Sequence, residues 1–122
     1  MSSAEFQCAR EYLGLPAAWV AAKLGVDRRT VNRWEGGSVP SHAASQMREW
    51  LARTERAVGL VTLKALEDKD SPLWATPDDF NDRMAAEGFP ASWQRMLCAR
   101  VAERTGRSIV WMSPDEMGRG IA

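Results

Sequence analysis

The sequence predicts a mainly α fold with a minor two-stranded β element. Apolar residues recur at spacings of three and four through most of the 122 residues, and glycines and prolines divide this pattern into helix-sized segments. The strongest strand signal is the apolar, β-branched run at residues 108–112. The length suits one ordinary domain or two small ones sharing a core.

Three short helices are predicted in the first 36 residues. The first covers Ala4–Leu13 and is closed by Gly14, and the second opens at Pro16, which suits a first helical turn because it lacks an N–H. Gly25 ends the second helix. Asp27 is a suitable N-cap for the third helix, predicted over residues 28–35.

The glycine-containing turn between the second and third helices is typical of a helix-turn-helix. An eight-residue helix is unstable alone, so we expect Val31 and Trp34 to hold it against its neighbours. The polar residues left facing outward are Arg28, Arg29, Asn32 and Arg33. Arginine can bind guanine and asparagine can bind adenine through paired hydrogen bonds, which are the contacts of major-groove reading.

Residues 14–37 resemble the helix-turn-helix of the Cro/phage-repressor (Xre-type) family, whose pattern LGV-S-x-x-T-V-x-R-W-E-x-G is matched at nearly every position from Leu24 to Gly37. The resemblance implies that the four outward residues face DNA bases. It also implies a buried ion pair between Arg10 and Glu35. Where the family commonly has a hydroxyl cap followed by Gln, this chain has Pro16 and Ala17.

Phosphate contacts are predicted around this motif. Backbone amides near Ala17 are expected to serve in place of the missing hydroxyl cap, and Lys23 and Thr30 flank the third helix. Ser38 lies in the loop just beyond it. Gln7 is either a further phosphate contact or an ordinary exposed residue.

The second half is predicted to be a helical dimerisation region with short strands, giving domains at 1–40 and 41–122. We expect a helix from His42 to about Glu67, capped by Ser41 and weakened at Gly59. A two-residue extended segment at 73–74, a helix from Thr76 to Gly88, a helix from Ser92 to Gly106 and the strand at 108–112 follow. The extended segments are too short for a stable sheet within one subunit, which favours pairing across a two-fold axis.

The wider chain resembles small regulators of the YdiL-like group and the anti-CRISPR-associated repressors. Their opening pattern E-x-Q-x-x-R-x-x-L is nearly matched at residues 5–13, and their pattern W-x-x-x-x-x-x-V-A is matched from Trp93 to Ala102. This resemblance implies a homodimer that binds an inverted repeat in double-stranded DNA and represses a promoter, often its own.

Composition narrows the classes of function. The 16 Lys+Arg balance 16 Asp+Glu, which excludes a protein that coats nucleic acid by bulk charge. Residues 1–56 nevertheless hold eight basic and six acidic residues, and residues 23–35 hold four and two. The longest apolar stretch, residues 17–22, is far too short for a membrane span, and Glu5 and Glu11 do not fit a signal peptide. These features predict a cytoplasmic protein without membrane contact.

No catalytic, metal or cofactor site is predicted. Cys8 and Cys98 are expected to be buried, reduced thiols, and His42 alone cannot complete a zinc site with them. The acidic residues of 67–87 lack the spacing of a calcium loop, and no nucleophile, base and orienting residue converge. The six tryptophans suggest either base stacking or, more readily, core and dimer packing, and Trp19 has no predicted place.

The functional hypothesis is therefore a sequence-specific DNA-binding transcriptional regulator, a homodimeric repressor. One alternative is the antitoxin of a toxin–antitoxin pair, whose second half binds a protein partner. Another is a protein-interaction adaptor that has lost DNA binding, for which the missing Gln at position 17 is the only support.

Overall fold

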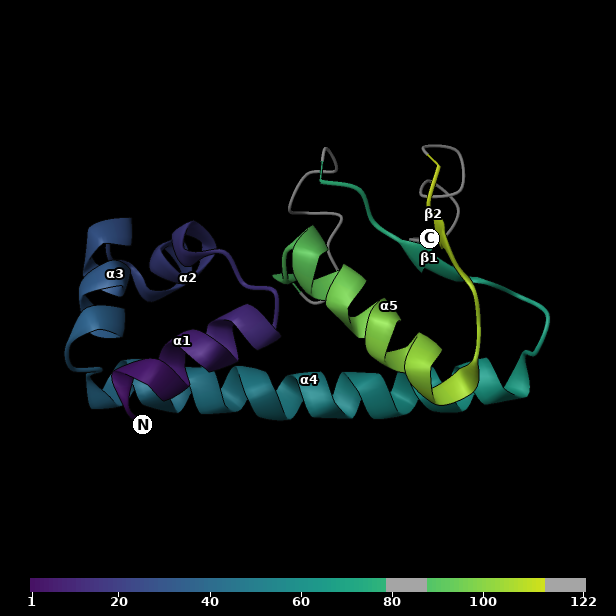
Figure 1. Ribbon diagram of the computed structural model, residues 1–122, viewed down its shortest axis with the longest axis horizontal. Coiled ribbons are helices and arrows are strands. Elements are labelled where there is room, and N and C mark those ends of the chain that lie inside the picture. Colours follow the sequence, from purple (N-terminus) through teal and green to yellow (C-terminus); the bar gives the residue numbers. More distant parts are fainter. Residues whose placement is uncertain (79–87, 114–122) are drawn as a thin grey trace. The chain divides into compact units, whose positions relative to one another are not determined.

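The computed structural model describes residues 1–78 and 88–113, and within them the chain is mainly helical with one two-stranded sheet (Figure 1). This confirms the predicted fold class. The elements in order are α1 (Ser3–Tyr12), α2 (Ala17–Leu24), α3 (Arg28–Gly36), α4 (Ser41–Glu67), β1 (Leu73–Ala75), α5 (Ala91–Thr105) and β2 (Ile109–Trp111).

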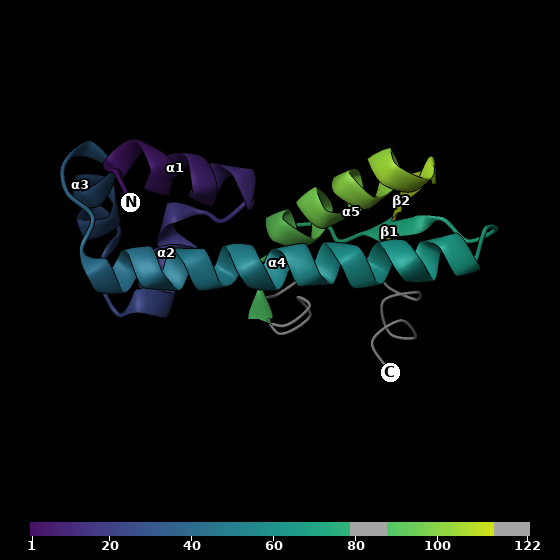
Figure 2. The same cartoon turned by 90° about the horizontal axis from the view of Figure 1, so that it is seen from below.

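The chain divides into two compact units, Met1–Glu55 and Arg56–Ala122. The division falls inside α4, fifteen residues beyond the predicted boundary at residue 40. The first part of α4 belongs with the N-terminal unit because it contributes core side chains there, namely the buried Ala43, Ala44, Met47 and Trp50. α4 itself is one unbroken helix through Gly59, where the sequence indicated a weak point (Figure 2).

A capping box starts α1. The Ser2 hydroxyl accepts a hydrogen bond from the Glu5 backbone N–H at 3.0 Å, and the Glu5 carboxylate accepts one from the Ser2 N–H at 2.8 Å. These bonds from Ser2 lower the pKa of the Glu5 carboxyl. One turn later, Phe6 is fully buried. The capping box thus fixes where the helix begins and which face turns inward.

The turn between α2 and α3 follows the local signals in the sequence. Gly25 ends α2 in the left-handed conformation with φ +68°, and the Val26 N–H donates to the Ala21 carbonyl at 3.0 Å. Asp27 then caps α3, because its carboxylate accepts from the Thr30 N–H at 3.0 Å. Both predicted end signals are confirmed.

The two strands correct the expected pairing across a two-fold axis. β1 and β2 pair with each other in parallel within one chain, with Leu73 opposite Ile109 and Ala75 opposite Trp111. α5 is part of the connection that parallel strands require. Gln94 of α5 adds side-chain bonds to this short sheet, accepting from the Thr76 N–H at 2.8 Å and donating to the Trp74 carbonyl at 2.7 Å.

The remaining expectations of the second half are partly tested. α5 starts after Pro90 and ends at Gly106, close to the predicted limits. The helix predicted from Thr76 to Gly88 falls mostly on residues 79–87, which lie outside the described residues. The two cysteines differ from the prediction: Cys98 is buried but Cys8 is exposed, because it lies next to Gln7 on the solvent side of α1. No helix among the described residues is long and apolar enough to cross a membrane.

Two glycine-to-alanine changes are predicted to have opposite effects on stability. Gly25→Ala places a side chain at φ +68° and should lower the free energy of unfolding by about 1 kcal/mol. Gly59→Ala lies within α4, where an added Cβ meets nothing within 4 Å, and should raise it by about 0.5–1 kcal/mol. Urea denaturation followed by circular dichroism measures both, and equal signs for the two variants would contradict the assigned conformations.

Candidate nucleic-acid interface

α3 presents one buried and one exposed face. Val31 is fully buried, and Trp34 and Glu35 are partly buried. At about 100° per residue, Arg29 and Arg33 lie about 160° round the helix from Val31. All four residues predicted to face bases are exposed: Arg28, Arg29, Asn32 and Arg33. The structure therefore brings these four together on the solvent side of one helix.

An ion pair joins α3 to α1. The Arg10 guanidinium donates through Nε to Glu35 Oε2 at 2.6 Å and through Nη2 to Oε1 at 3.0 Å, which is the two-bonded geometry of a strong pair. Its Nη1 donates to the Leu15 carbonyl at 3.1 Å, which adds the segment before α2. The side chains are only 15% and 7% exposed. The hydrogen bonds to Glu35 raise the pKa of Arg10, against the opposing effect of burial. The expected ion pair is confirmed.

Aromatic contacts hold the same face of α3. The Trp34 ring lies edge-on to Phe6 of α1, with ring centroids 6.2 Å apart, and edge-on to His42 of α4, with centroids 5.9 Å apart. Three helices thus meet around Trp34. The consequence is that α3 cannot rotate to bury its arginines without breaking these contacts and the ion pair.

Thr30 has a structural role that the sequence analysis did not assign. Its N–H and hydroxyl both donate to the Asp27 carboxylate, at 3.0 and 3.3 Å, and its hydroxyl oxygen accepts from Arg33 Nη2 at 3.3 Å. Thr30 therefore helps to cap α3 and to orient Arg33, instead of standing free as a predicted phosphate contact.

The other predicted phosphate contacts are distributed around α3. Lys23 is exposed on α2, and its Nζ lies 5.5 Å from the centroid of the Trp19 ring. Ala17 is the first residue of α2, whose N-cap, Pro16, makes no side-chain capping bond. Ser38 is exposed just past α3, whereas Gln7 is half-buried on α1, away from the α2–α3 pair in the sequence.

Trp19 is the residue that sequence reasoning could not place. Its ring packs against Trp50 of α4, with centroids 5.1 Å apart and planes tilted by 55°. This contact fastens α2 to the N-terminal part of α4. The separation of Trp19 and Lys23 by one helical turn was a local signal for their contact, but no local signal links Trp19 to a residue 31 positions later.

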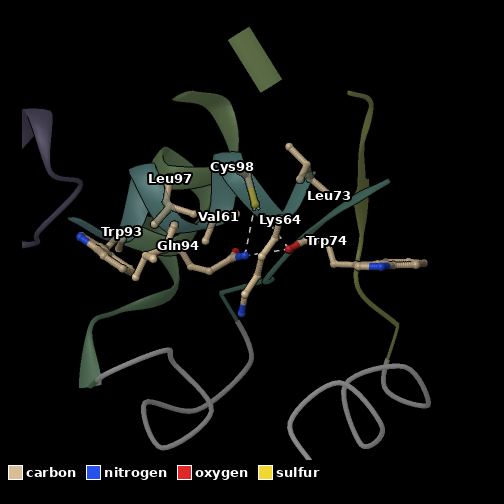
Figure 3. A pocket seen from close by; sticks show the side chains of 10 residues that line it. Val61, Lys64, Leu73, Trp74, Trp93, Gln94, Leu97 and Cys98 are labelled. Atoms are coloured by element: carbon tan, nitrogen blue, oxygen red, sulfur yellow. Dashed lines mark hydrogen bonds between the residues drawn. The ribbon is translucent and has the colours of Figure 1, made fainter. Parts of the chain in front are cut away.

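The second unit contains an apolar cavity of about 340 Å³ (Figure 3). It lies among α4, β1 and α5 and is lined by Ala57, Leu60, Val61, Lys64, Leu73, Trp74, Trp93, Gln94, Leu97 and Cys98. The Gln94 amide donates to the Trp74 carbonyl at 2.7 Å and to the Cys98 sulfur at 3.2 Å. Burial raises the pKa of the Cys98 thiol, so it stays protonated and weakly nucleophilic at neutral pH.

The described part of the chain holds no group of three or more His, Cys, Asp or Glu side chains arranged to bind a metal ion. Three acidic residues of the run noted in the sequence, Asp79, Asp82 and Glu87, lie outside that part. A scan against protein-family models gives no match, and no curated protein matches the sequence. The functional argument therefore depends on the geometry of α3 and the residues that hold it.

Removing one partner of the Arg10–Glu35 pair tests how α3 is held. Arg10→Met leaves the Glu35 carboxylate partly buried without its cation, and we expect it to lower the free energy of unfolding by about 2 kcal/mol. The double variant Arg10→Met/Glu35→Met should recover most of this loss, because no charge is left unpaired. Urea denaturation measures both. A double variant as unstable as Arg10→Met would show that the pair is not the source of the loss.

Proposed function

We propose that this chain is a sequence-specific DNA-binding transcriptional regulator whose α3 enters the major groove. One observation carries the proposal: α3 is fastened through its inner face and exposes Arg28, Arg29, Asn32 and Arg33 together. A helix surface with three arginines is repulsive unless an anion is bound to it. Guanidinium and amide groups on one short helix also match the hydrogen-bonding edges of guanine and adenine.

The acidic residues beside this surface are already engaged. Asp27 accepts hydrogen bonds from Thr30 at the start of α3, and Glu35 is paired with Arg10. Neither carboxylate therefore neutralises the outward arginines. The result is a local positive field on a chain of zero net charge, and such a field acts within about 8–10 Å at physiological salt.

The residues divide into base readers and positioning contacts. Arg29 and Arg33 point most directly away from the core, and Thr30 restricts Arg33 through a 3.3 Å hydrogen bond. We assign them, with Arg28 and Asn32, to the bases. Lys23, the amides at the start of α2, Ser38 and Gln7 are assigned to the phosphates, which set the register without reading sequence.

A single helix of nine residues can read only a half-site, so the proposal includes a homodimer on an inverted repeat. The half-sites would lie one helical turn, about 34 Å, or a multiple of it apart. The regulator would act as a repressor in the cytoplasm, where it meets its operator.

Selection of bound duplexes from a random DNA pool tests this proposal. We expect an enriched inverted repeat, with two half-sites at a fixed spacing. Recovery of unenriched sequences at low salt, or of no DNA at all, would contradict the proposal, and enrichment of single-stranded or RNA ligands in parallel pools would redirect it.

Arg29→Ala should weaken binding to the selected sequence by about 1–3 kcal/mol and relax the preference at one base pair. Fluorescence anisotropy with matched and single-mismatch duplexes measures both effects. Arg104→Ala, which removes an exposed arginine from α5, is the control and should change neither. Equal weakening on all duplexes would instead make Arg29 a phosphate contact.

Lys23→Ala is predicted to behave differently from Arg29→Ala. Loss of a phosphate contact weakens binding about uniformly across sequences and reduces the salt dependence by about one counterion. Titrations at several salt concentrations give the slope of log K against log [salt]. Lys69→Ala, an exposed lysine beyond α4, should leave the slope unchanged, and an unchanged slope for Lys23→Ala would remove Lys23 from the interface.

A further inference from the structure

The C-terminal part of α4 exposes large apolar side chains. Leu60 and Leu63 are each 61% exposed, whereas Val58 and Ala65, on the opposite side of the same helix, are buried. Exposed leucines that follow one another along a helix form a patch of the kind that marks an interaction surface. This face of α4 thus lacks a covering element among the described residues.

The exposed face continues into charged residues at regular spacing. Arg56, Leu60, Leu63 and Glu67 follow one another at intervals of four, three and four residues, and all four are exposed. This is the spacing of the seam in a two-helix coiled coil. We call these four residues the α4 stripe.

The α4 stripe is complementary to itself when one copy is reversed. A two-fold axis between residues 61 and 62 places Leu60 opposite Leu63 of the second copy. The same axis places Arg56 opposite Glu67 of the second copy, so two oppositely charged pairs flank two leucine pairs. Parallel helices would instead place Arg56 against Arg56 and Glu67 against Glu67, which is unfavourable.

Small and flexible neighbours fit the same arrangement. The axis that pairs Leu60 with Leu63 also places Gly59 opposite Lys64 of the second copy. Gly59 has no side chain and open space around its Cα, so the lysine stem can lie across it while its ammonium group stays in water.

We propose that a second copy of this chain covers the α4 stripe, with the two α4 helices antiparallel. This inference deepens the homodimer of the proposed function and assigns it an interface on α4 instead of the strands. The occupant is a second copy because the stripe contains both halves of its own charge pattern. The strands are already paired within each chain, whereas the stripe is exposed in each copy.

Charge reversal tests both the surface and the direction of the helices. Arg56→Glu and Glu67→Arg each place like charges opposite one another twice per dimer, and each should raise the dimer dissociation constant about tenfold. Mixing the two variants restores both oppositely charged pairs, so the mixture should form a dimer of two different chains. Sedimentation velocity without DNA measures the mass against the 13.6 kDa chain.

Matched variants separate this effect from general charge change and from unfolding. Arg104→Glu and Glu103→Arg reverse exposed charges on α5 and should leave the dimer unchanged, alone and mixed. Leu60→Ser/Leu63→Ser should be monomeric with an unchanged far-ultraviolet circular dichroism spectrum. Because masses are measured without DNA, failure of DNA binding leaves this inference standing, and failure of dimerisation leaves half-site binding to be measured.

Three results would overturn the inference. The first is a wild-type chain that is monomeric at 100 μM or above. The second is wild-type-like dimerisation of both charge-reversed variants. The third is a mixture of the two variants that stays monomeric, which would assign the stripe to a parallel arrangement or to a different protein partner.

Discussion

The Arg10–Glu35 ion pair is the interaction on which the N-terminal unit depends. It is two-bonded, almost buried, and shares its guanidinium with the Leu15 carbonyl, so one side chain ties α1, the segment before α2, and α3 together. A nine-residue helix has little stability of its own. Together with the burial of Val31 and the ring contacts of Trp34, the pair decides which face of α3 is inside. The exposure of the arginines follows from that choice.

The same pair shapes the electrostatics of the chain. Its formation removes Glu35 from the set of carboxylates that could neutralise α3, and the capping bonds from Thr30 occupy Asp27 in the same way. The folded chain therefore carries a concentrated positive surface although its total charge is zero. A count of charged residues cannot reveal this, because it treats a buried, paired carboxylate and a solvated one alike.

The sequence predicted the N-terminal unit closely because its signals are local. Gly25, Asp27 and the helical spacing of Val31 and Trp34 act within a few residues of one another. The second unit was less accessible. The parallel pairing of β1 with β2 depends on α5, whose Gln94 bonds to residues 18 and 20 positions earlier, and no local pattern encodes this. The Trp19–Trp50 contact, the exposure of Cys8 and the cavity beside Cys98 were missed for the same reason: each depends on tertiary packing.

Pairing of the strands within the chain also changes where self-association can occur. With β1 and β2 bonded to each other, the largest exposed apolar side chains on a helix of the described second unit are Leu60, Leu63 and Leu66 of α4. The stripe that contains the first two carries a positive residue at one end and a negative residue at the other, which makes an antiparallel copy its electrostatic complement. Zero net charge removes the long-range repulsion that would oppose bringing two such chains together. The balance of charges thus suits self-association, while the local excess on α3 suits an anionic ligand.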